Sequence, residues 1–244
     1  KWINMDESIK YQNQKYILIA AVWGVILQVL TTPYITPFAI ALKATNFEIG
    51  LLTAVMTFSA YTVQLLAPYL TNYLTSRVLV CAVAFIVQGI IWFPIAIVPH
   101  LNLPAPVWWL IMLIILTNAA GGIVGPIWTS LVADSVDENK RGAFFAKMFR
   151  LLNIVSLGLM FITGWVLNWF GKESFTGFTI LFILAGGAII ISGITFNKVS
   201  DPGWTPQRET RLSYLEFLRT FGRNNFSRLV LFVSLILFFA QSFD

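Results

Sequence analysis

The stretch that decides the fold is VWWLIMLIILTNAAGGIVGPIWTSLVA, residues 107–133, which contains no Asp, Glu, Lys or Arg in 27 positions. About 20 mostly apolar residues suffice for an α-helix to cross a hydrocarbon core about 30 Å thick. Five other stretches meet the same criterion, at residues 16–42, 49–71, 78–98, 151–170 and 174–197. The sequence therefore predicts six membrane-spanning helices.

The composition of the whole chain indicates the same class. Of the 244 residues, 57% are hydrophobic and only 11% are charged, whereas a soluble domain carries about a quarter charged residues. The net charge is +5, but the basic residues lie between the apolar stretches, as in membrane proteins, so we expect no nucleic-acid partner. The apolar stretches lack the period-two alternation of membrane β-barrel strands. We therefore expect an all-α polytopic membrane protein.

Cysteine and histidine are too scarce for a metal centre. Cys81 lies inside an apolar stretch and His100 in a connector, and each is the only residue of its type. We therefore predict no disulfide, metal or cofactor. The six spans also contain no Asp, Glu or His, which makes a membrane enzyme the least favoured class.

The basic residues are distributed unequally between the two sides of the predicted bundle. Fourteen Lys and Arg residues fall on the side of the N-terminus, and only Lys43 and Lys172 on the other. By the positive-inside rule, the N-terminus is cytoplasmic in a multi-pass plasma-membrane protein, which we expect to be of the bacterial inner membrane. An aromatic belt at the outer helix ends agrees with this orientation. Its members are Trp92, Trp108, Trp109, Trp165 and Trp169.

The chain divides into four predicted regions. A cytoplasmic segment (1–15) precedes the six-helix bundle (16–197), and a cytoplasmic linker (198–228) leads to the start of a seventh span (229–244). Within the linker, Ser213 and Glu216 form the pattern of a capping box that opens an amphipathic helix. The final stretch is too short to cross a bilayer, so we expect the protein to continue into a C-terminal bundle.

Residues at the junction of the fourth and fifth spans carry a family resemblance. Residues 125–134 (GPIWTSLVAD) and 140–145 (KRGAFF) resemble the helix 4–5 junction of bacterial members of the major facilitator superfamily. The six spans, the cytoplasmic linker and the seventh span agree with that architecture. The resemblance implies two six-helix bundles, each a 3+3 inverted repeat, that move a small solute by alternating access about a midplane site.

Other family signatures are degraded. The loop between helices 2 and 3 of the family has the pattern Gly-x-x-x-Asp-Arg-x-Gly-Arg/Lys-Arg/Lys, and residues 68–77 (PYLTNYLTSR) keep only the final Arg77. The helix 4 arginine, four residues before a glycine, is replaced by Thr117, and the fifth span lacks the proline of drug antiporters. These departures support an alternative function, a transporter-like scaffold, sensor or assembly subunit without transport activity. A channel is a further rival.

Because the six spans contain no charged side chain, solute recognition in this half would use neutral polar and aromatic groups. A buried amide needs a hydrogen-bond partner, so we expect these groups to face the bundle interior. Helix–helix hydrogen bonding is the alternative role for each of them. Gln28 and Asn118 rank first, because they lie mid-span on the first and fourth helices. The candidates are Gln28, Thr32, Tyr61, Gln64, Gln88, Asn118 and Asn153.

The first and fourth spans also share helix-interrupting residues. These spans occupy matching positions in a 3+3 repeat, where interrupted helices mark the substrate pathway of many transporters. The alternative is that the glycines only let helices pack closely. The predicted hinge residues are Pro33, Pro37, Gly121, Gly122, Gly125 and Pro126.

Two charges at the predicted cytoplasmic ends are placed against the helix dipole. Asp134 ends the fourth span and Arg77 precedes the third, so each is destabilised by the dipole of its own helix. We expect Asp134 to pair with Arg77, Arg141 or Arg150 and to latch the cytoplasmic side, so that Asp134→Asn shifts the inward–outward balance. Ordinary solvated loop charge is the alternative. Facilitated diffusion and ion coupling through the C-terminal bundle both stay open.

Overall fold

The structure is a computed structural model that describes residues 7–73, 76–170 and 175–201; for residues 65–73 it describes the backbone alone. Within these ranges the chain forms helices and no strand. The elements are α1 (Glu7–Thr31), η1 (Thr32–Tyr34), α2 (Ile35–Ala41), α3 (Asn46–Tyr73), α4 (Arg77–Ile97), η2 (Val98–His100), α5 (Pro106–Ser135), η3 (Glu138–Lys140), α6 (Arg141–Phe170) and α7 (Phe175–Phe196), where η marks a 3₁₀-helix.

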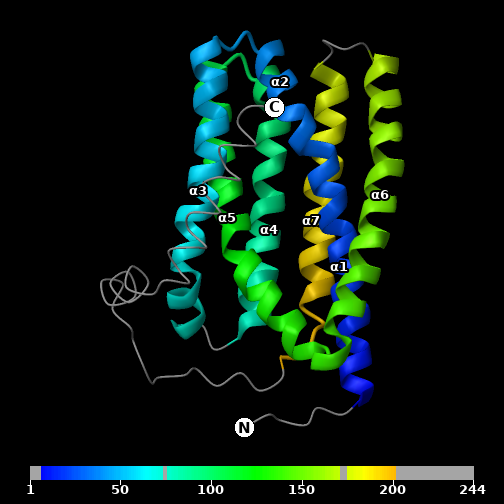
Figure 1. Cartoon of the computed structure of the whole chain (residues 1–244). Coiled ribbons are helices and arrows are strands. Elements are labelled where there is room, and N and C mark those ends of the chain that lie inside the picture. The colour runs from blue at the N-terminus through cyan, green and yellow to red at the C-terminus, as the bar shows by residue number, and fades with distance from the viewer. Residues whose placement is uncertain (1–6, 74–75, 171–174, 202–244) are drawn as a thin grey trace, which may run out of the picture. The chain divides into compact units, whose positions relative to one another are not determined.

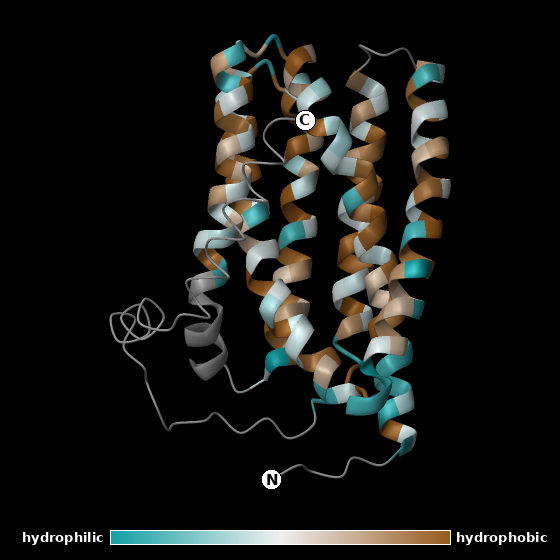
Figure 2. Cartoon of the chain, viewed as in Figure 1, coloured by the Kyte–Doolittle hydropathy of each residue, from teal (hydrophilic) through white to brown (hydrophobic). Residues whose placement is uncertain are grey.

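Five helical segments of the described residues are long and apolar enough to cross a bilayer. They contain the predicted third, fourth and fifth spans, and all but one or two terminal residues of the first and sixth. The predicted second span lies in α3, whose 28 residues extend about 42 Å. Figure 2 shows hydrophilic residues gathered where α1 begins and α5 ends, with apolar residues along the helices above. The prediction of a polytopic all-α membrane protein is therefore confirmed. The five segments are Glu7–Ala41, Arg77–His100, Pro106–Ser135, Glu138–Phe170 and Phe175–Phe196.

Several helices extend beyond their predicted spans. α1 begins at Glu7, inside the predicted N-terminal segment 1–15, and α6 begins at Arg141, ten residues before its predicted span. Hydropathy locates only the part of a helix that lies in hydrocarbon, whereas backbone hydrogen bonding continues into the polar region. The predicted amphipathic helix of the linker and the start of the seventh span lie outside the described residues.

Helix packing follows the pattern that a 3+3 repeat requires. The main pairs are α4 with α7, α3 with α5, α1 with α7, α4 with α5, and α1 with α6. In such a repeat, α1, α3 and α4 correspond to α5, α6 and α7, in that order. The contact of α1 with α7 therefore corresponds to that of α5 with α4, and the contact of α3 with α5 corresponds to that of α6 with α1. The pair α4–α7 maps onto itself. In Figure 1, α3 and α6 accordingly lie at opposite edges of the bundle.

Glycines bring the backbones of α4 and α7 into direct contact. A Cβ atom on Gly186 would lie 2.8 Å from the carbonyl oxygen of Gly89, and one on Gly89 would lie 2.7 Å from that of Gly186. About two turns further along α7, a Cβ on Gly193 would lie 2.8 Å from the Ala82 carbonyl oxygen. Small residues permit this approach in membranes, where helices associate through packing and not through exclusion of water.

Aromatic rings fill the core beside this contact. The ring centroid of Phe182 lies 5.0 Å from that of Phe38 and 5.2 Å from that of Trp92. Trp92 is only 3% exposed, so its predicted place in an aromatic belt is wrong. Its position near a helix end does not determine which face of α4 it occupies. The other four belt candidates are exposed, as predicted: Trp108, Trp109, Trp165 and Trp169.

Adjacent glycines on α7 provide a matched test of the α4–α7 contact. We expect Gly186→Ala to destabilise the protein by about 1–3 kcal/mol, because the added methyl group meets backbone atoms. Gly187→Ala should be neutral or stabilising by up to about 1 kcal/mol, since nothing lies within 4 Å of its Cβ position and alanine favours a helix. Thermal unfolding of both variants in detergent measures the difference. Equal stabilities for the two variants would contradict the close contact.

Candidate functional site

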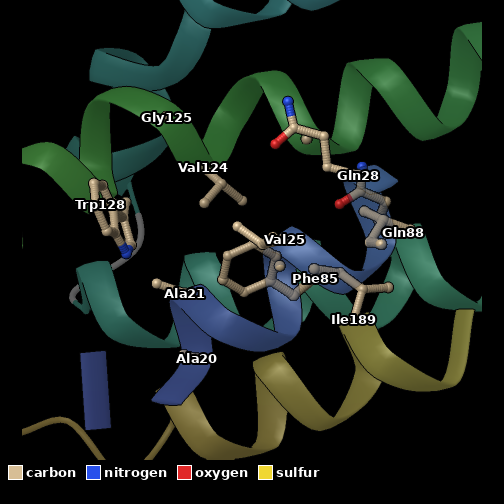
Figure 3. Close-up of a pocket in the computed structure, with 13 residues that line it drawn as sticks. Ala20, Ala21, Val25, Gln28, Phe85, Gln88, Val124, Gly125, Trp128 and Ile189 are labelled. Atoms are coloured by element: carbon tan, nitrogen blue, oxygen red, sulfur yellow. The ribbon is translucent and has the colours of Figure 1, made fainter. Parts of the chain in front are cut away.

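An uncharged cavity of about 330 Å³ opens between α1, α4, α5 and α7. Two amides, Gln28 of α1 and Gln88 of α4, lie toward one end of it, and Trp128 of α5 lies at the other end (Figure 3). Phe85 lies between them. The remaining lining is aliphatic or glycine, so the cavity offers hydrogen-bonding amides and aromatic faces without any formal charge.

Gln28 also lines a second cavity of about 400 Å³, between α1 and α6. The polar groups of this cavity are Gln28, Thr32, Asn153 and Ser156, and it too lacks charged side chains. Gln28 and Val25 are common to both cavities. Four of the predicted solute-binding residues, Gln28, Thr32, Gln88 and Asn153, therefore line one or both of two cavities that share Gln28.

The three glycines of α5 have different surroundings. A Cβ on Gly121 would lie 2.8 Å from Nε2 of Gln88, and one on Gly125 would lie 3.7 Å from Nε2 of Gln64. Gly121 thus leaves room for the Gln88 amide at the cavity, whereas a Cβ on Gly125 would make only ordinary van der Waals contact with Gln64. Gly122 faces α3 instead, where a Cβ would collide with the carbonyl oxygen of Ala60. The close-packing alternative therefore applies to Gly122.

Three predicted binding residues, Tyr61, Gln64 and Asn118, do not line either cavity. The Asn118 side-chain nitrogen donates to the Ile114 carbonyl oxygen of its own helix at 2.9 Å. Tyr61 is 64% exposed on α3. Asn118 and Tyr61 both lie mid-span, as the sequence indicates, but depth in the membrane does not determine the direction of a side chain around its helix.

Only one of the two predicted helix interruptions is present. The first span changes to a 3₁₀ turn at η1, which contains Pro33, and Pro37 then falls in the first turn of α2, where a missing N–H is tolerated. The Tyr34 hydroxyl donates to Oγ1 of the fully buried Thr163 at 2.6 Å, which ties this break to α6. By contrast, α5 continues through Pro126 as one helix of 30 residues.

At the polar end of the bundle, Arg77 connects three segments. Its Nη1 donates to Oδ2 of Asp134 and to Oγ of Ser130, both at 2.8 Å, and its Nη2 donates to Oδ1 of Asp201 at 3.0 Å. The Arg77 backbone N–H donates to Oδ2 of Asp201 at 3.2 Å. Asp201 thus places a carboxylate at the N-terminus of α4, where the helix dipole favours it. Arg77 itself is 4% exposed.

The structure distinguishes among the three partners considered for Asp134. Arg77 is its ion-pair partner, whereas the Arg141 side chain donates to the Val136 carbonyl oxygen at 3.2 Å. Arg150 is exposed, and it has no ion pair within the described part of the chain. Sequence reasoning missed Asp201, because a following Pro-Gly marked it only as a turn. An acid directly after the sixth span, on the same predicted side as Arg77, was the available signal.

The family model of the Major Facilitator Superfamily matches residues 16–243. The chain belongs to the major facilitator superfamily. The resemblance predicted from residues 125–145 is thereby confirmed, and the protein is a multi-pass membrane transporter of a family whose members move small solutes and are not enzymes. A comparison with curated proteins returned no match.

In this superfamily member, further polar contacts join α1 to the same end of the bundle. Asn13 is 1% exposed and exchanges two hydrogen bonds with the backbone of Ser200, at 2.8 and 2.9 Å. Lys10 pairs with Asp137 at 2.6 Å, and this hydrogen bond lowers the pKa of the Asp137 carboxyl. The segment after α7 is therefore held by α1 through Asn13 and by α4 through Arg77.

We expect Asp201→Asn to destabilise this transporter by about 1.5–3 kcal/mol, because the substitution removes the charge from two hydrogen bonds to Arg77. Glu138→Gln is the matched control, since it removes one exposed acid at the same end of the bundle. Thermal unfolding in detergent measures both variants. A loss of stability as large in Glu138→Gln as in Asp201→Asn would show that net charge, and not the Arg77 contact, is responsible.

Proposed function

We propose that the two cavities that share Gln28 form this chain's half of a binding site for a small neutral solute. The observation that carries the proposal is that no lining residue of either cavity is charged. An ionic solute would leave its charge without a counter-ion in an apolar surrounding, which is costly. The amides of Gln28 and Gln88 both donate and accept hydrogen bonds.

The lining narrows the class of solute. A cavity with amides at one end and the aromatic rings of Phe85 and Trp128 along the rest suits a molecule with hydroxyl groups and an apolar face. Cavities of 330 and 400 Å³ lie at the lower end of the range for small-molecule sites. A sugar or another neutral polar or amphipathic compound fits these conditions.

The proposed mechanism is alternating access. The bundle described here (16–197) would rock against a C-terminal bundle of the same protein, reached through the linker (198–228) and a seventh span that begins at residue 229. The Arg77–Asp134 pair supports a latch on the polar side, and the η1 break supports bending of the first span. We place the polar end in the cytoplasm of a plasma membrane, the bacterial inner membrane, because it carries most of the Lys and Arg residues.

Transport by the full-length protein in liposomes tests the proposed site. We expect saturable counterflow of a neutral sugar or polyol, and Gln28→Ala or Gln88→Ala should raise its apparent KM about three- to tenfold by removing one hydrogen bond. Gln12→Ala, an exposed amide on α1 outside both cavities, should leave KM unchanged. Organic anions and cations serve as comparison solutes.

Other outcomes of that experiment would identify the rival functions. Uptake that does not saturate would indicate a channel. No flux, together with no solute-dependent thermal stabilisation, would favour the scaffold or sensor that the degraded loop signature allows. Saturable uptake of charged solutes alone would contradict the neutral site.

The latch has a separate test in the accessibility of the cavity. In a Cys81→Ala background, we expect Asp134→Asn to change the rate at which a Val25→Cys side chain is alkylated from the cytoplasmic side by about tenfold, because one state loses a charged hydrogen bond. Val25 is suitable because it lines both cavities. Glu138→Gln should leave the rate unchanged. An unchanged alkylation rate in Asp134→Asn would show that the Arg77–Asp134 pair is ordinary surface charge and not a latch.

A further inference from the structure

A third cavity, of about 230 Å³, lies between α1 and α6 at the polar end of the bundle. It shares no lining residue with the two solute cavities. Leu18, Phe144 and Met148 form an apolar wall, and Met148 is only 1% exposed. Lys15 of α1 and Lys147 of α6 also line it. The cavity therefore combines an apolar surface with two cations from different helices, and we call it the lysine groove.

The positive charge of the lysine groove is not neutralised by the described residues. Neither Lys15 nor Lys147 forms an ion pair in the described part of the chain, and no acidic residue lines the groove. Of the carboxylates at this end of the bundle, Asp137 is engaged by Lys10 and Lys140 and Asp134 by Arg77, and neither Glu7 nor Glu138 lines the groove. Two uncompensated ammonium groups favour an anionic occupant.

The depth of the groove in the membrane indicates what kind of anion this is. Lys15 immediately precedes the first predicted span, and Lys147 lies one helical turn before the fifth. Both ammonium groups therefore belong at the level of the lipid headgroups, while Leu18, inside the first predicted span, lies at the level of the upper acyl chains. Lys15 and Lys147 are exposed, so a molecule in the surrounding bilayer has access to them.

We propose that the lysine groove binds one anionic phospholipid. Lys15 and Lys147 contact its phosphate, and the glycerol backbone and upper acyl chain lie against Leu18. Basic pockets between transmembrane helices are a recognised means of holding anionic lipid headgroups. The site is independent of the solute cavities and joins the first and fifth spans, so the lipid stabilises the α1–α6 pair.

Lipid titration of the intact full-length protein, followed by native mass spectrometry, tests the proposal. We expect one phosphatidylglycerol to bind per chain, and Lys15→Gln/Lys147→Gln to weaken its binding about thirty-fold, the effect of two lysines near a membrane surface. Lys140→Gln/Lys198→Gln removes the same charge at the same end but outside the groove, and should change the affinity less than about twofold. Lys15→Arg/Lys147→Arg should retain binding.

Several results would overturn the proposal. Phosphatidylcholine binding as tightly as phosphatidylglycerol would show that the net charge of the headgroup is not recognised. Inorganic phosphate displacing the lipid at equal concentration would indicate a site for a free anion. Equal weakening in the control pair would indicate diffuse electrostatics. The thermal stability of Lys15→Gln/Lys147→Gln in phosphatidylcholine alone should equal that of the wild type, which separates lost binding from misfolding.

Discussion

The contact between the backbones of α4 and α7 at Gly89 and Gly186 determines the arrangement of the other helices. These are the third helices of the two three-helix repeats, and their close approach places the axis of the bundle between them. α1 packs on α7 and α5 packs on α4, which leaves the first helices of both repeats beside the cavity at Gln28. α3 and α6 then occupy the two edges. The α4–α7 contact and the cavity thus belong to one packing arrangement, with α1 held on α7 and α5 on α4.

Charge is restricted to the ends of the helices, and this separates the two kinds of polar chemistry in the bundle. Within the spans, some neutral amides and hydroxyls line a cavity, as Gln28 does, and others bond to a backbone carbonyl, as Asn118 does. At the polar end, Arg77 is buried but is compensated by two carboxylates and a hydroxyl. A buried cation needs such compensation. Asp134 lies in the last turn of α5, and Asp201 follows α7. Arg77 therefore ties the second repeat to the first.

Hydropathy predicts the helices and their order well, because the cost of an unsatisfied polar group in lipid allows few solutions. The same rule predicts that Gln28 and Gln88 face inward and that Arg77 and Asp134 lie at one end. It does not determine rotation about a helix axis, which explains the outcomes for Tyr61, Asn118 and Trp92. The role of Gly186 and the reach of Asp201 depend on which segments become neighbours. That information is present only after the helices have packed.

We expect the uncharged lining at Gln28 and Gln88 to face solvent inside a transporter and not to face lipid. The most direct measurement is the reaction of single cysteines with a membrane-impermeant thiol reagent, in membranes that contain the full-length Cys81→Ala protein. Gln28→Cys and Gln88→Cys should react, whereas Val87→Cys and Ile90→Cys, on the exposed apolar face of α4, should not. Equal reactivity of all four positions, or reaction at Val87 and Ile90 alone, would contradict the account.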